Sequence, residues 1–141
     1  MKILVTGGSG FIGTNYIDSL LKIMNYSILN IDINKPKKID HEKYWRECNI
    51  LDYGRLAAII KDFKPDYVVH LAAQTGVNRL NDIHSFDTNI QGVKNLINAL
   101  NEVNSTKRVI FTSSLLVCKM GYMPKSDTDY MPSTAYGVSK V

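Results

Sequence analysis

A tyrosine and a lysine, Tyr136 and Lys140, stand four residues apart near the end of the chain. Residues at this spacing face each other on a helix, so the lysine ammonium can stabilise the tyrosine as a phenolate. A phenolate can take a proton from a hydroxyl group. Ser114 follows an apolar run and can donate a hydrogen bond to a substrate oxygen. The three residues indicate proton transfer, but the Tyr–Lys spacing alone is common, so its meaning depends on what precedes it.

A glycine-rich turn lies near the start of the chain, where residues 6–13 read TGGSGFIG. Gly7 allows a sharp turn, Gly10 lets the backbone approach a pyrophosphate, and Gly13 lets the following helix pack closely. The helix N-terminus adds free N–H groups and partial positive charge for an anion. A tight strand-to-helix turn alone needs fewer glycines, so the spacing predicts a dinucleotide site.

An aspartate, Asp32, follows the second apolar run, 19 residues after Gly13. A carboxylate at this place can accept hydrogen bonds from ribose hydroxyls, and it repels a 2′-phosphate. This favours NAD over NADP as the cofactor. Lys35, Lys37 and Lys38 could offer charge to a phosphate, but a solvated loop is the favoured interpretation for them.

Strand and helix patterns alternate along the chain. Apolar β-type runs predict five strands, at 2–6, 27–31, 44–48, 67–71 and 108–112. Apolar residues at helical spacing predict helices at 11–24, 53–63 and 87–103, and a further helix begins at Tyr136. This order predicts an α/β fold with a doubly wound, Rossmann-type parallel sheet. The complete sheet has about six strands, so we expect this one to be incomplete on its C-terminal side.

Several side chains have structural interpretations. The first helix is expected to carry Phe11, Ile12, Ile17, Leu20, Leu21 and Met24 at helical spacing, and the inward face of the long helix to carry Ile90, Val93, Leu96, Ile97 and Leu100. We expect His70 to pack at a strand end, Trp45 to pack at the sheet edge, His41 and His84 to lie at the surface, and Cys48 and Cys118 to be reduced thiols. No metal site is expected.

The composition excludes several classes of protein. The chain has 141 residues, 45% of them hydrophobic, and a formal net charge of +4. This length predicts one domain, 1–141, with a substantial core. The basic residues are scattered, which argues against a nucleic-acid partner. No apolar run is long enough for a signal peptide or a membrane span, so a cytoplasmic protein is expected.

Four motifs appear in a familiar order: TGGSGFIG at 6–13, HLAA at 70–73, FTSS at 111–114 and YGVSK at 136–140. Together they resemble the extended short-chain dehydrogenase/reductases, in particular the NAD-dependent nucleotide-sugar epimerase/dehydratase group. The resemblance covers essentially the whole chain. It implies a Rossmann-type domain, bound NAD and a nucleotide-sugar substrate linked to UDP, dTDP or GDP.

The resemblance also assigns roles to individual positions. It implies Ser114, Tyr136 and Lys140 as the catalytic residues. Asn49 stands where the family usually has an aspartate, and its amide can still hydrogen-bond the adenine edge. The implied cofactor-binding residues are Gly7, Gly10, Phe11, Ile12, Gly13, Asp32, Ile33, Asn49, Ile50, Leu71, Ala72, Ala73, Thr75, Asn89, Tyr136 and Lys140.

The residues after Ser114 reduce the number of reactions that the chain could catalyse. Dehydratases of the resembled group usually carry an Asp-Glu pair there, whereas this chain has Leu115 and Leu116, which cannot transfer protons. The sequence therefore favours an NAD-dependent epimerase acting on a sugar carbon, C4 in our interpretation, through a keto intermediate. A 4-keto-sugar reductase is the alternative. Alternatives of other classes are a non-catalytic NAD-binding module and a structural partner of a second polypeptide.

Complete members of the resembled group are roughly twice as long as this chain. We therefore expect a truncated NAD-binding domain that lacks the last strands and the substrate domain, is inactive alone and exposes apolar faces. The resemblance implies a homodimer through the helix at 87–103 and the helix that begins at Tyr136, and we expect this dimer to be compromised here.

Overall fold

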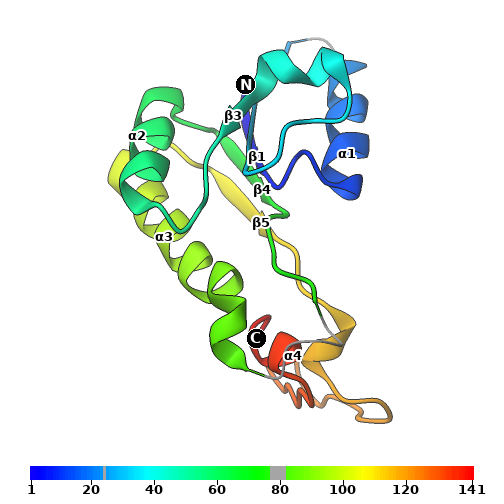
Figure 1. The fold of residues 1–141 in the computed structure, drawn as a ribbon. Helices are drawn as coiled ribbons and strands as arrows, with labels where there is room; N and C mark the ends of the chain where they lie inside the picture. Colours follow the sequence, from blue (N-terminus) through cyan, green and yellow to red (C-terminus); the bar gives the residue numbers. More distant parts are fainter. Residues whose placement is uncertain (24, 77–81) are drawn as a thin grey trace.

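The computed structural model describes residues 1–23, 25–76 and 82–141. Its centre is a parallel sheet in the order β3-β2-β1-β4-β5 (Figure 1). This order, in which the chain starts at the centre and winds outward in both directions, confirms the predicted doubly wound fold. The strands are β1 (Lys2–Thr6), β2 (Ser27–Asp32), β3 (Trp45–Glu47), β4 (Tyr67–His70) and β5 (Arg108–Phe111).

Helices cover both faces of the sheet. The helix α1 lies on one face, and α2 and α3 lie on the other (Figure 1). A short fourth helix, α4, lies beside the start of α3, beyond the end of the sheet (Figure 1). The α-helices are α1 (Phe11–Leu21), α2 (Tyr53–Phe63), α3 (Asp87–Val103) and α4 (Ala135–Val138), and the 3-10 helices are η1 (Ile39–Tyr44), η2 (Ile83–Phe86) and η3 (Leu115–Val117).

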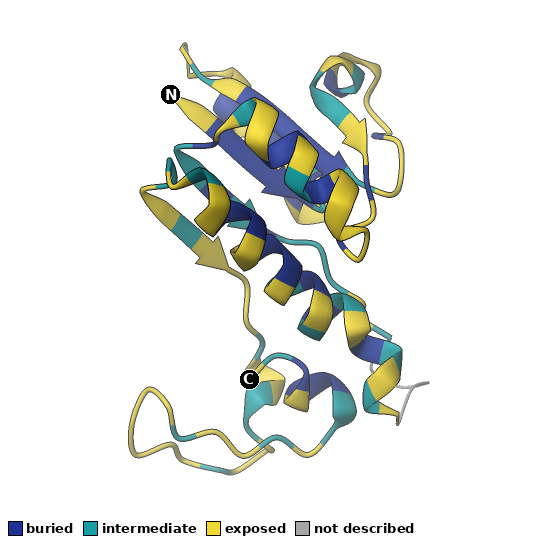
Figure 2. Cartoon of the chain, turned by 90° about the vertical axis from the view of Figure 1, so that its left-hand side faces the viewer, coloured by how far each residue is buried: buried dark blue, intermediate teal, exposed yellow. Residues whose placement is uncertain are grey.

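The central strands are buried on both sides because successive side chains point to opposite faces. In β1, Ile3 and Val5 pack on the α1 side, while Leu4 packs on the side of α2 and α3. Each fully buried aliphatic side chain contributes about 1.5–3 kcal/mol relative to its exposed state. The colours of Figure 2 change from buried in the centre of the sheet to exposed or intermediate on β3 and β5.

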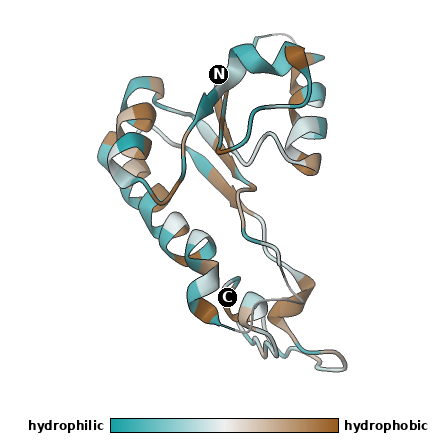
Figure 3. Cartoon of the chain, viewed as in Figure 1, coloured by the Kyte–Doolittle hydropathy of each residue, from teal (hydrophilic) through white to brown (hydrophobic). Residues whose placement is uncertain are grey.

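The last strand, β5, forms one edge of the sheet. Its side chains include Ile110, which is 54% exposed, and Phe111, which is 43% exposed. The expected exposure of apolar side chains on this face is therefore present. The 3-10 helix η3 is a second exposed apolar segment, coloured hydrophobic in Figure 3, and its Leu115 is 94% exposed.

The bounds of α2 and α3 agree with the sequence prediction, because local signals mark their ends. The Asp52 carboxylate accepts a hydrogen bond from Arg55 N at 3.0 Å and caps α2. Lys64 (φ 50°) and Asn104 (φ 47°) end the two helices in the left-handed conformation. The first strand has the predicted bounds, and the ends of the other four strands differ from the predicted ones by at most one residue. The first helix is shorter than predicted and ends at Leu21, and Met24 lies outside the described residues.

The predicted inward face of α3 is wrong in part. Leu96 and Leu100 are buried, but Ile97 is 40% exposed, and Ile90 and Val93 are only half-buried. The buried stripe also holds polar and small residues, which are Asn89, Gly92, Asn95 and Ala99. These polar residues are buried because α3 packs against backbone carbonyl groups of the segments that follow β3 and β4 as well as against the sheet. The prediction from hydrophobicity alone therefore placed the buried face of α3 only in part correctly.

No helix in the described part of the chain combines the length and apolar character that crossing a membrane requires. Within the same residues, no three His, Cys, Asp or Glu side chains gather as metal ligands could. Cys48 is buried and Cys118 is half-buried, and both are free thiols as expected.

Candidate functional site

The glycine-rich turn joins the ends of β1, β4 and α1 at very short distances. Gly7 has φ +72°, and a Cβ there would lie 2.6 Å from Ala72 N. A Cβ at Gly13 would lie 2.4 Å from Gly8 Cα, so the helix packs directly on the turn. Gly8 also has a packing reason that the sequence interpretation missed, since a Cβ there would lie 2.3 Å from the buried Asn30 Oδ1.

The first turn of α1 is open to solvent. Its N-cap residue, Gly10, has no side chain to accept a hydrogen bond from the N–H groups of this turn. Phe11 is 87% exposed and Ile12 is 60% exposed, so these two residues do not join the core. Of the apolar residues at helical spacing in α1, Ile17 and Leu20 are buried and form its core-facing side. An open helix N-terminus of this kind suits an anion.

Asp32 ends β2 next to the glycine turn. One carboxylate oxygen accepts a hydrogen bond from Ser9 N at 3.0 Å, and the other accepts one from Asn34 N at 2.9 Å. Trp45 Nε1 donates to the carbonyl oxygen of Asp32 at 3.1 Å. The bonds from Ser9 and Asn34 fix the carboxylate beside the glycine turn, and each of its oxygens keeps a further lone pair for a ligand.

A cavity of about 600 Å³ lies between the glycine turn, the end of β2 and the end of β4. Nine of the residues predicted to bind a cofactor line it: Gly7, Gly10, Asp32, Ile33, Asn49, Ile50, Leu71, Ala72 and Ala73. The sequence interpretation missed six other lining residues, which are Ser9, Ile31, Asn34, Cys48, Gln74 and Thr88. Ser9 lies inside the glycine motif, and Gln74 directly follows the HLAA motif. Lys35 and Lys37, for which a solvated loop was favoured, also line the cavity.

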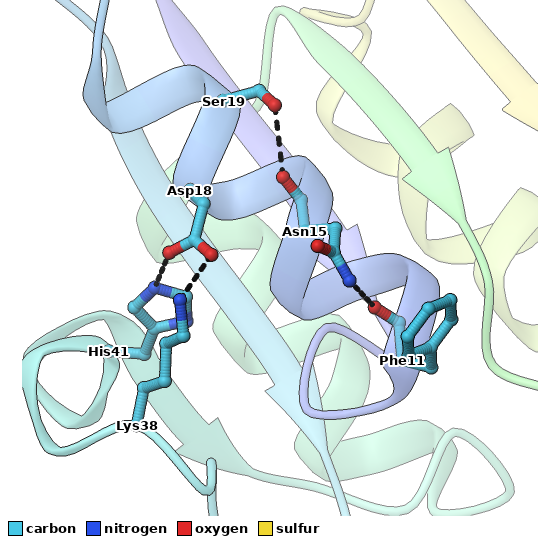
Figure 4. Close-up of polar contacts among 6 residues, drawn as sticks. All are labelled: Phe11, Asn15, Asp18, Ser19, Lys38 and His41. Carbon is cyan, nitrogen blue, oxygen red and sulfur yellow. Dashed lines mark hydrogen bonds and ion pairs between the residues drawn. The ribbon is translucent and has the colours of Figure 1, made fainter.

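The chain between β2 and β3 is held against the outer face of α1. Asp18 accepts hydrogen bonds there from Lys38 Nζ and, at 2.9 Å, from His41 Nε2 (Figure 4). The expectation that His41 lies at the surface is wrong, because this residue is 1% exposed. The pairing with a carboxylate on another helix compensates its burial. The Lys38 and His41 contacts anchor the segment that carries Lys35 and Lys37, which also line the cavity.

A second cavity, of about 420 Å³, lies between α3, the end of β5 and the residues after α4. His70, Asn89, Ser113 and Lys140 line it together with apolar side chains of α3. Burial lowers the pKa of the half-buried Lys140 ammonium. The buried Asn89 donates hydrogen bonds to Gln74 O at 3.1 Å and to Ser139 Oγ at 2.8 Å, so it joins the chain after β4 to the C-terminal segment.

Tyr136 and Ser114 lie close to this second cavity but do not line it. Tyr136 is buried, and its ring packs edge-on against Phe86, with 5.8 Å between the centroids. The Ser114 hydroxyl accepts a hydrogen bond from Leu116 N at 3.2 Å and caps η3. Gly137 brings α4 onto η3, since a Cβ there would lie 2.2 Å from Leu116 O.

The predicted helical pairing of Tyr136 with Lys140 differs from the structure. The helix α4 ends at Val138, and Lys140 follows in a turn. Within residues 1–23, 25–76 and 82–141, no hydrogen bond joins the side chains of Ser114, Tyr136 and Lys140. The structure therefore brings the three residues to one end of the sheet without linking them to each other.

The comparison with known protein families decides the classification. The model of the NAD dependent epimerase/dehydratase family matches residues 3–141. The chain belongs to this family. The described fold and the ordered motifs agree with that assignment, and members of the family are enzymes.

Individual family members show what the chain resembles. It is 32% identical to the UDP-glucose 4-epimerase of Mycoplasma pneumoniae over 99% of the chain and 45% of the relative. A crystal structure of UDP-glucose 4-epimerase from Thermotoga maritima with UDP-glucose has a TM-score of 0.84 and 30% identity, covering 99% of this chain and 48% of that one. The Brucella ovis UDP-glucose 4-epimerase, solved in complex with NAD, has a TM-score of 0.81 and 27% identity, covering 99% and 44%. The chain thus spans less than half the length of these relatives.

The remaining residues predicted from the family resemblance lie outside the 600 Å³ cavity. The first turn of α1, directly after Gly10, contains Phe11, Ile12 and Gly13. Thr75 is exposed in the segment after β4. Asn89 and Lys140 line the second cavity. In this member of the epimerase/dehydratase family, the site therefore has one open cavity at the glycine turn and a second group of residues around α4.

Proposed function

We propose that the chain binds NAD in the 600 Å³ cavity. The observation that carries this proposal is the convergence of three features on that cavity: the close-packed glycine turn, the open N-terminus of α1 and the fixed Asp32 carboxylate. The pyrophosphate lies over Gly7 and Gly10 and meets the helix N–H groups. Asp32 accepts hydrogen bonds from the adenosine ribose. The NAD seen with the Brucella ovis relative supports this proposal.

The adenine half of NAD is assigned to the cavity wall after β3. Ile50 supplies an apolar contact, and Asn49 supplies an amide. Asn49 Oδ1 accepts a hydrogen bond from Leu51 N at 3.0 Å, which fixes the side chain in a turn and leaves its NH₂ group for a ligand. Ile33 closes the ribose side of the cavity. Leu71, Ala72 and Ala73 line the opposite side, toward the nicotinamide half, with Thr75 beyond them.

The proposed activity is reversible epimerisation of a nucleotide-sugar at C4. Tyr136 takes the proton of the sugar hydroxyl. It returns this proton after the keto intermediate has rotated to present its other face, so no net proton is consumed. The Lys140 ammonium stabilises the phenolate, and Ser114 donates a hydrogen bond to the sugar oxygen. Bound NAD supplies the hydride acceptor, and its reduced form supplies the donor. The UDP-glucose 4-epimerase relatives support UDP-linked sugars as the substrate class.

Two other activities remain as alternatives. A 4-keto-sugar reductase would use the same three residues. Dehydration is disfavoured because Ser114 is followed by Leu115 and Leu116, whose side chains cannot donate or accept a proton. A non-catalytic NAD-binding module is supported by one observation. Tyr136 and Ser114 do not line the cavity that Lys140 lines.

Titration with NAD and NADP tests the cofactor assignment. Trp45 is the only tryptophan and donates a hydrogen bond to Asp32 O, so its fluorescence reports binding. We expect tighter binding of NAD, and we expect Asp32→Asn to reduce the preference for NAD over NADP about tenfold, because the repulsion of a 2′-phosphate is lost. Asp127→Ala, a change in an exposed loop, is the control. Tighter binding of NADP by the unaltered protein would contradict the assignment.

A reaction with UDP-glucose or UDP-galactose in the presence of NAD tests the activity. We expect reversible interconversion at a low rate, because Tyr136 and Ser114 do not line the cavity that Lys140 lines, and a misplacement of about 1 Å in a catalytic group can reduce the rate about 100-fold. Tyr136→Phe should remove it. Net consumption of a reduced cofactor with a 4-keto-sugar would indicate the reductase instead. Binding of NAD without either reaction would leave the binding module as the function.

A further inference from the structure

A buried amide on α3, Asn95, contacts the turn that follows β3. Its side chain is 6% exposed. The amide nitrogen donates hydrogen bonds to Ile50 O at 3.0 Å and to Leu51 O at 3.2 Å. The amide oxygen accepts a hydrogen bond from Gln91 Nε2 at 2.8 Å. Asn95 therefore uses both ends of its amide, and neither end faces the cavity.

The partners fix the orientation of this amide. Carbonyl oxygens only accept hydrogen bonds, so the Asn95 nitrogen must face Ile50 and Leu51. Both carbonyls lie beyond the end of β3 at Glu47, where the ladder of the sheet does not reach them. Asn95 thus takes the place of a strand partner for this part of the backbone.

A second contact of α3 reaches the same turn. Gly92 lies three residues before Asn95, on the same face of the helix. A Cβ at Gly92 would lie 2.5 Å from Ile50 Cδ1 and 2.7 Å from Ile50 Cγ1. A side chain at position 92 would therefore require Ile50 to move, and Ile50 lines the 600 Å³ cavity with Asn49.

We propose that Asn95 and Gly92 are positioning residues for the adenosine half of the nucleotide site. Asn95 holds the Asn49–Leu51 turn by its carbonyls, and Gly92 sets how far Ile50 can withdraw toward α3. Together they fix the wall of the cavity that faces adenine. This inference rests on the proposed function, since it assumes that NAD occupies this cavity. It adds two residues of α3 that touch no ligand and are not part of the cavity lining.

Asn95→Leu and Gly92→Ala test the inference from two independent contacts. The first removes the donors to two carbonyls, and the second pushes Ile50 into the cavity. Asn98→Leu is the matched control, because Asn98 is exposed three residues further along α3. The dissociation constants of NAD, AMP and inorganic pyrophosphate are measured by titration for each protein, since pyrophosphate probes the glycine turn alone. If Asn95→Leu does not fold, Gly92→Ala carries the test.

We expect both variants to raise the dissociation constants of NAD and AMP by about the same factor, roughly tenfold. The dissociation constant of pyrophosphate should change less than about twofold. The control should bind all three ligands as the unaltered protein does. AMP constants within about twofold of the unaltered protein would overturn the inference and leave Asn95 as a structural residue only. An equal loss of pyrophosphate binding would also overturn it, because the substitutions would then disturb the glycine turn as well as the adenosine half of the site. An unaltered protein that binds neither NAD nor AMP would instead overturn the proposed function.

Discussion

Gly13→Val should destabilise the protein by about 3 kcal/mol or more and abolish NAD binding. A Cβ at Gly13 would lie 2.4 Å from Gly8 Cα and 2.6 Å from Gly7 O. Both neighbours are backbone atoms of the glycine turn, so a rotamer change cannot relieve the overlap. The helix must move away from the turn, which disrupts the buried packing of Ile17 and Leu20 and displaces the N–H groups assigned to the pyrophosphate.

Two further glycine variants separate loss of fold from loss of binding. A Cβ at Gly10 would lie 3.3 Å from Gly7 O, at the edge of normal contact, so Gly10→Ala should fold. Its methyl group would lie in the lining of the cavity and weaken NAD binding. A Cβ at Gly54 would meet only the Asp52 carboxylate at 3.8 Å, so Gly54→Ala should change neither property. Thermal unfolding and NAD titration of the three proteins check these results. A Gly13→Val protein that melts like the unaltered one would refute the steric argument.

The stability of the protein should fall by about 3 kcal/mol between pH 6.5 and pH 4 because of His70 alone. His70 is 2% exposed, and its Nδ1 lies 2.7 Å from Thr6 Oγ1. Burial, and then the positive charge of Lys140, lower the pKa of His70 to about 4 from an ordinary value of 6.5. Between these values the unfolded chain binds a proton that the folded protein does not bind. The free energy of unfolding therefore decreases as the pH falls through this range and levels off below pH 4.

Other groups contribute at lower pH, so the measurement needs a matched variant. Hydrogen bonds and ion pairs lower the carboxyl pKa of Asp18 and Asp66, and their stabilisation is lost only when the pH falls toward and below the ordinary carboxyl range. His70→Asn keeps a polar partner for Thr6 and removes the imidazole. Urea unfolding of both proteins at pH 7 and pH 4 gives the difference that belongs to His70. A decline of equal size in both proteins would show that His70 does not titrate as its burial requires.

The sequence was most informative where a local signal and a long-range pattern agreed. Its glycine spacing located the turn at 6–13, and the structure places Asp32 in the lining of the cavity next to this turn. The helices at 53–63 and 87–103 have the predicted bounds, since their caps are short-range features. The parallel sheet followed from the alternation of apolar runs with helices, which leaves few possible topologies.

The errors concern residues whose surroundings come from distant parts of the chain. His41 was predicted at the surface, but Asp18 on α1 accepts its hydrogen bond and allows its burial. The interior face of α3 was predicted from its large aliphatic residues and is correct for Leu96 and Leu100, but Asn89 and Asn95 are also buried there against backbone carbonyls. A hydropathy pattern cannot anticipate a buried amide, because the carbonyl groups that satisfy it lie about 15 to 45 residues away in the chain.

The sequence by itself determined the family, the topology and the chemical types of the side chains at the site. The tertiary structure decided which of these side chains share a cavity. It gathered Gly7, Gly10 and Asp32 around one cavity, because the parallel strands end at the same edge of the sheet. It placed Lys140 on a second cavity and Tyr136 against Phe86, because α4 ends at Val138 and packs on η3 through Gly137. The sequence gives the candidate catalytic residues, but the contacts that orient them form only when distant segments pack together.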